Sequence, residues 1–563
     1  MTHSTSTQVS ASAGHGSRAR VVAAGILTSR VLGLVRQATI SYFFGIGPHA
    51  DVYEAALRGP NLLQNLLGEG TISAAFVPVY SRLLEQGRAR DAGRFAGAVL
   101  GLLLAVAALV VMVGILLAEP LVTVLTPGFV NDASKVAAGT LTVNRFELTV
   151  QAIRLIFPMT GVLVLSAWAL GVLNSHRRFF LPYVAPVLWN IAIIGSLVGA
   201  SVWLVRPPVG GGTLSVEGLN RLLFAAFAGA LVGGILQFLI QLPLVFRVMR
   251  GFRLSLSTRV DGLREALTAF GPVVAGRGVY QLSGYLDVLL ASLLAAGALA
   301  AVRPALMLYL LPVSLFGQSV AASELPELSR LGADASHAFV DRLQQSIRQS
   351  LFLIVPATIG YLGVGFLIVG GLLRRGEFGL ADNWLVYVVL AGYSSGLVAT
   401  TVSRLLHNGF WALGDTRTPA KIAGVRVVAS AVVAVPMMFW LDRLSVTETF
   451  GLAPDGAPLF MGAFGLALGA TVGAWLELWR LATALRRQLV SFGVPWRRAC
   501  AMSVTSVTAL APAVGLWWLC AAWPMLPLAV VVVGSYGAIY LGVSRWLGAT
   551  ELQTWTGRIR TRG

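Results

Sequence analysis

Two arginines lie inside a segment that is otherwise apolar enough for a membrane. The stretch "TSRVLGLVRQATISYFFGIG" runs from Thr28 to Gly47 and carries Arg30 and Arg36. An arginine near the bilayer centre costs roughly 2.5–3.5 kcal/mol, so two cost about 5–7 kcal/mol unless they face water or a partner. On a helix, Ser29, Gly33 and Arg36 share a face, and the two arginines lie about 9 Å apart along the axis. Two guanidinium groups at that spacing could clamp a diphosphate.

A second interpretation applies to Arg30, which is close to the start of the segment and could snorkel to the membrane surface. More polar side chains nevertheless fall within apolar segments, and cations outnumber anions among them. A membrane bundle with a cationic interior attracts an anionic substrate, although some of these residues will form structural ion pairs. The polar residues are Arg58, Asn61, Gln64, Glu69, Arg154, Arg277, Gln281, Ser283, Asp287 and Arg404.

The composition indicates a polytopic membrane protein. The 563 residues are 56% hydrophobic and only 12% charged, with a mean hydropathy of +0.77. A soluble protein carries about twice that share of charge. The net charge of +18 is explained by loop arginines that orient the chain in the membrane, not by nucleic-acid binding. Cys500 and Cys520 match no metal or redox spacing, and the sequence contains neither HExxH nor GxxxxGK.

Apolar runs of the length that a spanning helix needs, about 20 residues, predict about 14 transmembrane helices. Residues 1–20 lack the apolar run of a secretory signal and are predicted to form a disordered cytoplasmic tail. The predicted spans cover 21–45, 58–81, 93–117, 147–172, 180–204, 221–247, 269–296, 299–325, 347–372, 384–411, 421–441, 459–483, 499–521 and 525–547.

The loops predict that both ends of the chain are cytoplasmic. Arginine and lysine concentrate in alternate loops, such as "FRVMRGFRLSLSTR" and "RRQLVSFGVPWRR", as the positive-inside rule requires. The exception is "LRRGEF", which places Arg374 and Arg375 on the predicted outer side.

An internal repeat accompanies this pattern. "FVPVYSRLLEQGRARDAGRF" and "SELPELSRLGADASHAF" both contain proline followed by SRL, at Ser81 and Ser329, before a new span. The chain therefore reads as two parallel six-helix lobes, over 21–250 and 251–485, with two further helices and a cytoplasmic tail over 486–563. Transporters with such repeats bind substrate between the halves.

The first 85 residues resemble the MurJ (MviN) lipid II flippases of the MOP exporter superfamily. The likeness rests on "SRVLGLVRQATISYFFGIGPHADVYEAALRGPNLLQNLLGEGTISAAFVPVYSRL" and continues in "LTPGF", "LNSHRRFFLPYVAPVLWNIAII", "LLPVSLFGQSVAASELPELSR" and "GFWALGDTRTPAKIA". It implies two six-helix lobes around a central cavity, with two extra C-terminal helices. By position, Ser29, Arg30 and Arg36 match the first-helix cationic motif, Asp51, Asn61 and Glu69 match later motif positions, and Arg154 matches a basic position in the fourth helix.

The sequence also departs from that family's pattern. Gln37 stands where the family has aspartate, and Gln64 and Met307 stand at positions where it often has arginine. Arg277 and Arg303 are candidates to compensate.

These observations predict a flippase, not an enzyme. We expect it to move lipid II from the inner to the outer leaflet of the bacterial cytoplasmic membrane by alternating access, with no cofactor except a possible coupling cation. The substrate-binding candidates are Ser29, Arg30, Arg36, Asn61, Gln64, Glu69, Arg154 and Arg277, and the cation candidates are Asp287 and Asp415. Expected partners are the lipid-linked oligosaccharide, membrane lipids and possible cell-wall synthesis proteins, but no nucleic acid. Four alternatives stay open: a flippase for another polyprenyl-diphosphate-linked glycan, a non-transporting cell-wall scaffold, a multidrug antiporter and an intramembrane glycosyltransferase.

Overall fold

The described part of the chain is all-helical, as predicted. The computed structural model describes Gly25 and residues 28–205, 214–331, 337–453, 458–489, 491–549 and 551–552. Within these ranges it leaves out the side chains of Glu69 and of residues 275–284, 318–319 and 322–323. Apart from one isolated bridge between Ser445 and Phe460, the described residues form helices, turns and loops and no strand.

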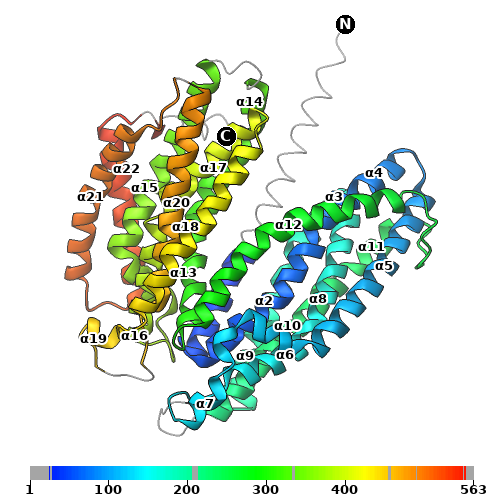
Figure 1. Cartoon of the computed structure of the whole chain (residues 1–563), viewed down its shortest axis with the longest axis horizontal. Coiled ribbons are helices and arrows are strands. Elements are labelled where there is room, and N and C mark those ends of the chain that lie inside the picture. The colour runs from blue at the N-terminus through cyan, green and yellow to red at the C-terminus, as the bar shows by residue number, and fades with distance from the viewer. Residues whose placement is uncertain are drawn as a thin grey trace. The chain divides into compact units, whose positions relative to one another are not determined.

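The chain divides into two compact units, Met1–Leu293 and Leu294–Gly563 (Figure 1). The first unit begins its described helices with residues 28–44. It continues with α2 (Pro48–Leu67), α3 (Glu69–Ala75), α4 (Val77–Glu85), α5 (Ala89–Leu116), α6 (Ala118–Leu125), the 3-10 turn η1 (Pro127–Phe129), α7 (Asp132–Ala137), α8 (Arg145–Ser175), α9 (Phe180–Trp203), α10 (Val216–Leu239), α11 (Leu242–Val248) and α12 (Leu263–Ser292).

The long helix α8 is the centre of the first unit. It is largely buried, and α2, α5 and α10 all pack against it. Trp168 of α8 is fully buried, and its indole Nε1 donates to the carbonyl of Ala96 in α5 at 3.1 Å. A buried indole needs such a partner for its N–H, so this bond fixes how α5 and α8 pack.

The predicted span over 58–81 is not one helix. It comprises the end of α2, all of α3 and the beginning of α4, with a break at Gly68, whose backbone leaves the helical region at ψ −142°. Pro60 lies inside α2 as well, and a proline removes one helical hydrogen bond. The polar residues Asn61 and Gln64 thus occupy the last two turns of a helix, not the middle of a membrane span.

The described residues of the second unit form ten α-helices and one π-helical stretch. They are α13 (Ala298–Pro312), η2 (Val313–Gln318), α14 (Ser319–Leu331), α15 (His337–Leu373), α16 (Leu380–Ser394), α17 (Leu397–Ala412), α18 (Arg417–Leu441), α19 (Val446–Thr449), α20 (Gly462–Gln488), α21 (Trp496–Leu519) and α22 (Met525–Trp546).

Helix α15 holds the two C-terminal helices in this unit. Both α21 and α22 pack against it, and they lie beside it in Figure 1. The hydroxyls of Tyr536 and Tyr540 in α22 donate to the carbonyls of Pro356 and Phe352 in α15, both at 2.8 Å. Pro326 lies inside α14 and Pro356 inside α15.

The second SRL element, at Ser329, lies on the short helix α14, which precedes the long helix α15. The first SRL element, at Ser81, likewise lies on the short helix α4, which precedes the long helix α5.

Eleven of the fourteen predicted spans coincide with helices that are long and apolar enough to cross a membrane. The predicted spans over 21–45, 58–81 and 269–296 match none of these within the described residues, so the count of 14 stays a prediction. These three segments contain most of the intramembrane arginines named above. The predicted boundary between the lobes, at residue 250, also stays a prediction; in the first unit, α12 packs on α2 and α3.

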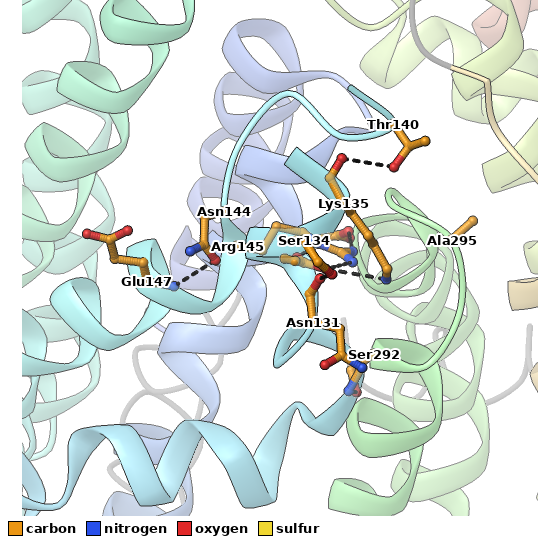
Figure 2. Close-up of polar contacts among 12 residues, drawn as sticks. Asn131, Ser134, Lys135, Thr140, Asn144, Arg145, Glu147, Ser292 and Ala295 are labelled. Carbon is orange, nitrogen blue, oxygen red and sulfur yellow. Dashed lines mark hydrogen bonds and ion pairs between the residues drawn. The ribbon is translucent and has the colours of Figure 1, made fainter. Parts of the chain in front are cut away.

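A buried ion cluster joins the start of α2, the α7 loop and the start of α8. Arg145 donates through Nε to Asp132 at 2.6 Å and through Nη1 to Asp51 at 2.9 Å. All three side chains are at most 2% exposed, and the guanidinium carbon lies 4.1 Å from the ring centroid of Phe129. Arg145 lies in the middle of the polar contacts drawn in Figure 2. Asp51, which matches a family motif position, thus belongs to this cluster.

The motif "LTPGF" brings the same loop against the end of α12. A Cβ built on Gly128 would lie 1.9 Å from the carbonyl oxygen of Ser292, so only glycine fits this approach. Phe129, the next residue, is the ring beneath Arg145. The glycine and the phenylalanine of the motif therefore serve two adjacent contacts.

We predict that Arg145→Met strongly destabilises the protein. The substitution removes the buried cation from Asp51 and leaves Asp132 only the longer contact with Lys135 at 3.4 Å, and breaking a buried ion pair in this way costs about 3–5 kcal/mol. Thermal unfolding of the purified protein in detergent measures the effect. Arg221→Ala is the matched control, because Arg221 pairs with Glu217 on an exposed face and such pairs contribute about 0–1 kcal/mol. Equal losses in the two variants would contradict a structural role for the cluster.

Candidate binding cavity

A cavity of about 450 Å³ lies within the first unit and collects five of the predicted binding residues. Its walls come from the first helix, from α2, α8, α9 and α10, and from Gln241, which lies between α10 and α11. The predicted residues in its lining are Ser29, Arg30, Arg36, Asn61 and Gln64. The helical face predicted from spacing, made by Ser29, Gly33 and Arg36, therefore does point to one space.

Arg36 is held by α9. Its guanidinium Nη1 donates to Oδ1 of Asn190 at 3.1 Å, and its carbon lies 4.6 Å from the ring centroid of Trp189. Asn190 is itself oriented, because its Nδ2 donates to the carbonyl of Pro186 at 3.1 Å. Arg36 is 8% exposed, so these contacts replace water around a nearly buried cation.

Arg30 lies six residues, about 1.7 turns, earlier on the same helix. Its side chain is exposed and also lines the cavity. Because the lining contains two arginines and no aspartate or glutamate, the cavity has a cationic character within the described residues. Such a site favours an anionic ligand.

Neutral polar groups form another part of the wall. The side-chain Nε2 of Gln241 donates to Oγ of Ser166 at 2.7 Å and to the carbonyl of Gln237 at 2.8 Å. These three residues line the cavity together with Asn61 and Gln64. Amide and hydroxyl groups that are fixed in this way can recognise hydroxyl or amide groups of a ligand.

Sequence reasoning missed several of these residues. Trp189 and Asn190 lie in a stretch that had been singled out only as a family motif, and Gln237 and Gln241 lie near the end of another span. A tryptophan and an asparagine that follow a proline inside an apolar span were the available signal. Nothing in the linear sequence shows that this face of α9 meets Arg36.

The other predicted binding residues lie elsewhere or outside the described part. Arg154 is on the exposed face of α8 and is not part of the lining. Glu69 begins α3 and Arg277 lies in α12, but the side chains of both are outside the described residues. Two positions where the family often has arginine also differ in their place: Gln64 lines the cavity, whereas Met307 is half-buried in α13 of the second unit.

Among the described residues, the two cation candidates do not belong to a metal-binding cluster. No group of three or more histidine, cysteine, aspartate or glutamate side chains suited to a metal is found among the described residues. Asp287 is half-buried in α12. Asp415 caps the first turn of α18, where its Oδ1 accepts from the backbone N–H of Thr418 at 2.9 Å and of Arg417 at 3.1 Å.

The comparisons with known proteins agree with one another. A sequence model described as lipid II flippase MurJ matches residues 40–534. A relative from Burkholderia cenocepacia named lipid II flippase MurJ is 31% identical over 460 residues, which are 80% of this chain and 84% of the relative.

Two solved structures support the fold. A lipid II flippase MurJ in an inward closed conformation superimposes with a TM-score of 0.68 at 19% identity, over 93% of this chain and 99% of that one. An inward-facing multidrug resistance MATE family transporter of the MOP superfamily superimposes with a TM-score of 0.59 at 16% identity, over 82% of this chain and 95% of that one. The likeness to both is a likeness of fold.

We predict that Asp415→Ala destabilises the protein by about 0.5–2 kcal/mol, the usual effect of losing a helix cap, whereas Asp415→Asn does not. The hydrogen bonds from Thr418 lower the pKa of Asp415 below its usual value of about 3.9. The stabilisation by the charged cap is therefore fully present above that usual value and is lost as the pH falls through the lowered pKa. Thermal unfolding at pH 7, with and without sodium, measures both variants. A sodium-dependent stabilisation that disappears in Asp415→Asn would instead make Asp415 a cation ligand.

Proposed function

Because this chain belongs to the MurJ lipid II flippase family, we propose that it moves lipid II from the inner to the outer leaflet of a bacterial cytoplasmic membrane. The family consists of multi-pass membrane transporters and not of enzymes. The single observation that best supports a substrate of this chemistry is the cationic cavity of the first unit. A polyprenyl-linked headgroup contains a diphosphate, which cannot cross hydrocarbon without compensation of its charge.

Arg30 and Arg36 hold the diphosphate in this proposal. Arg36 contributes a guanidinium that Asn190 and Trp189 already orient, so little side-chain freedom is lost on binding. Arg30 is exposed at the cavity and is able to follow the ligand as it enters. Arginine suits this role because its planar fork binds phosphate oxygens in pairs.

The neutral wall receives the sugar next to the diphosphate. Asn61, Gln64 and Gln237 offer amide groups for sugar hydroxyl and acetamido groups, and Trp189 offers an aromatic face. A volume of about 450 Å³ is typical of a site for a small molecule. We therefore assign to it the diphosphate and the adjoining sugar, not the complete disaccharide-pentapeptide.

Transport follows an alternating-access cycle in which the polyprenyl tail stays in lipid while the headgroup crosses through the cavity. No covalent step is needed, and no cofactor is proposed. The membrane potential contributes about 2.3 kcal/mol per charge per 100 mV, so either the potential or a coupling cation can drive the cycle. Asp287 remains the candidate in the membrane for such a cation. Cell-wall synthesis proteins are the proposed partners, and both chain ends are proposed to be cytoplasmic.

A second candidate function is a flippase for another polyprenyl-diphosphate-linked glycan. The observation that favours it is Gln64, which lines the cavity at a position where the family often has arginine. A neutral amide there changes the sugar-facing wall and leaves Arg30 and Arg36 in place.

Complementation tests the proposal. Cells depleted of their own lipid II flippase should be rescued by the wild-type chain and not by the Arg30→Ala, Arg36→Ala double variant. Each charge-assisted hydrogen bond contributes about 1.5–3 kcal/mol, so losing both cations weakens binding by about a hundredfold or more. Arg154→Ala is the matched control and should rescue, because Arg154 lies outside the cavity.

Membrane levels of every variant are compared by immunoblotting. Rescue by the double variant would overturn the diphosphate clamp but leave the transport function. Failure of a well-expressed wild-type chain would favour the other glycan, or a scaffold that does not transport. Failure of Arg154→Ala at a normal level would move part of the site to the exposed face of α8.

A further inference from the structure

A second cavity, of about 290 Å³, lies in the second unit, where the end of α15 meets the end of α21 and the start of α22. It is separate from the cavity used in transport, and the inference drawn from it does not rest on the proposed function. Six of its seven lining residues are apolar or aromatic and the seventh is a cation, although polar atoms make up more of the surface that faces the cavity than apolar atoms do. The lining residues are Leu367, Arg374, Trp517, Ala521, Trp523, Met525 and Leu528.

Two glycines of α15 allow this helix to pack closely against α22 next to the cavity. A Cβ built on Gly370 would lie 2.5 Å from the sulfur of Met525, and one built on Gly371 would lie 2.9 Å from Cβ of Ala529. The Cβ of Ala529 cannot move aside, so at Gly371 the backbone of α15 approaches α22 more closely than a residue with a side chain would allow. Arg374 follows just after the helix end, so its side chain leaves α15 beside the first residue of α22.

The aromatic wall is braced from behind. The ring of Trp517 stacks on Phe366, with centroids 6.2 Å apart and an interplanar angle of 18°. Phe366 in turn contacts Trp384, with centroids 4.5 Å apart. Trp523, on the other wall, is half exposed. Tryptophan is enriched where a membrane protein meets the lipid headgroups, because one side of its ring is apolar and its N–H is polar.

Among the described lining residues Arg374 is the only cation, and it has a different environment from its neighbour Arg375. Arg375 donates through Nη2 to the carbonyl of Gly371 at 3.5 Å, which places it at the C-terminal end of α15. Arg374 instead lies with Nη1 3.7 Å from the thioether of Met525. In the part of the chain that the structure describes, no carboxylate lies within ion-pair distance of Arg374.

The sequence makes this arginine unusual as well. It belongs to "LRRGEF", the loop that breaks the positive-inside pattern. An outer arginine that only contributed solubility would not need a cavity with two tryptophans beside it. The combination fits a ligand with a negative headgroup and an apolar body.

We propose that this cavity binds an anionic phospholipid of the leaflet predicted to be the outer one. Arg374 binds the phosphate through charge-assisted hydrogen bonds, and Trp517 and Trp523 enclose the glycerol backbone and the first carbons of a chain. The leucine, alanine, methionine and tryptophan side chains of the lining favour a lipid over a free anion, because only a lipid has apolar groups that can contact them. The bound lipid bridges α15 and α22 and thereby stabilises the packing of the two C-terminal helices.

The test uses the purified full-length protein in detergent, titrated with dioleoylphosphatidylglycerol, dioleoylphosphatidylcholine or inorganic phosphate. Thermal unfolding and native mass spectrometry report stabilisation and bound lipid. We expect phosphatidylglycerol to raise the unfolding temperature of the wild type and phosphatidylcholine to have a much smaller effect. Arg374→Gln should weaken the apparent affinity for phosphatidylglycerol about tenfold, as expected for the loss of one charge-assisted contact.

Arg443→Ala is the matched control. Arg443 is exposed just after α18, in a loop predicted to lie on the same side of the membrane, and it does not line the cavity. It should bind phosphatidylglycerol like the wild type. Equal affinity in Arg374→Gln and the wild type would overturn the proposal, and so would equal losses in Arg374→Gln and Arg443→Ala. Stabilisation by inorganic phosphate that matches phosphatidylglycerol would replace the lipid with a soluble anion.

Discussion

The free energy needed to place a guanidinium ion in a membrane protein governs the first unit. Arg36 is almost fully buried, yet an amide oxygen of Asn190 and the ring of Trp189 contact its charge. The packing of α9 beside the first helix supplies both groups, and Pro186 orients the amide. The result is a cation that is already positioned at the wall of a cavity. In the function that we propose, a preorganised charge of this kind loses little side-chain freedom when it binds an anion.

Other charges in the same chain are stabilised differently. Arg145 is enclosed by Asp51 and Asp132, and in the second unit Glu477 accepts from Arg426 at 2.7 Å. These pairs neutralise each other within the protein, so they fix helices and have no charge left for a ligand. Arg36 and Arg30 face a cavity lined by neutral groups. The surroundings of the guanidinium group thus differ between the buried ion cluster and the two cavity arginines, for which we propose a binding role.

The helical periodicity of the first segment predicted one correct feature of the site. Ser29, Gly33 and Arg36 share a face, and all three line the cavity. Asn61 and Gln64, which were predicted to bind substrate, also line the cavity, although the helix that carries them ends at Leu67 and does not continue through the predicted span. Pro60 and Gly68 lie within the predicted span and are compatible with a break there, but a hydropathy pattern alone cannot locate it. Asp51 shows the opposite case, because a motif position turned out to belong to a buried ion cluster.

The sequence by itself determined the all-helical membrane class, eleven of the spans, the family and the cationic face of the first helix. Hydropathy and helical spacing are local properties, so a single chain reveals them. Only the tertiary structure decided that Trp189, Asn190, Gln237 and Gln241 complete the cavity and that Arg154 does not. It also placed Arg374 beside Trp517 and Met525. Which faces of distant helices meet depends on the packing of the whole unit, and no periodicity within one helix encodes its neighbour.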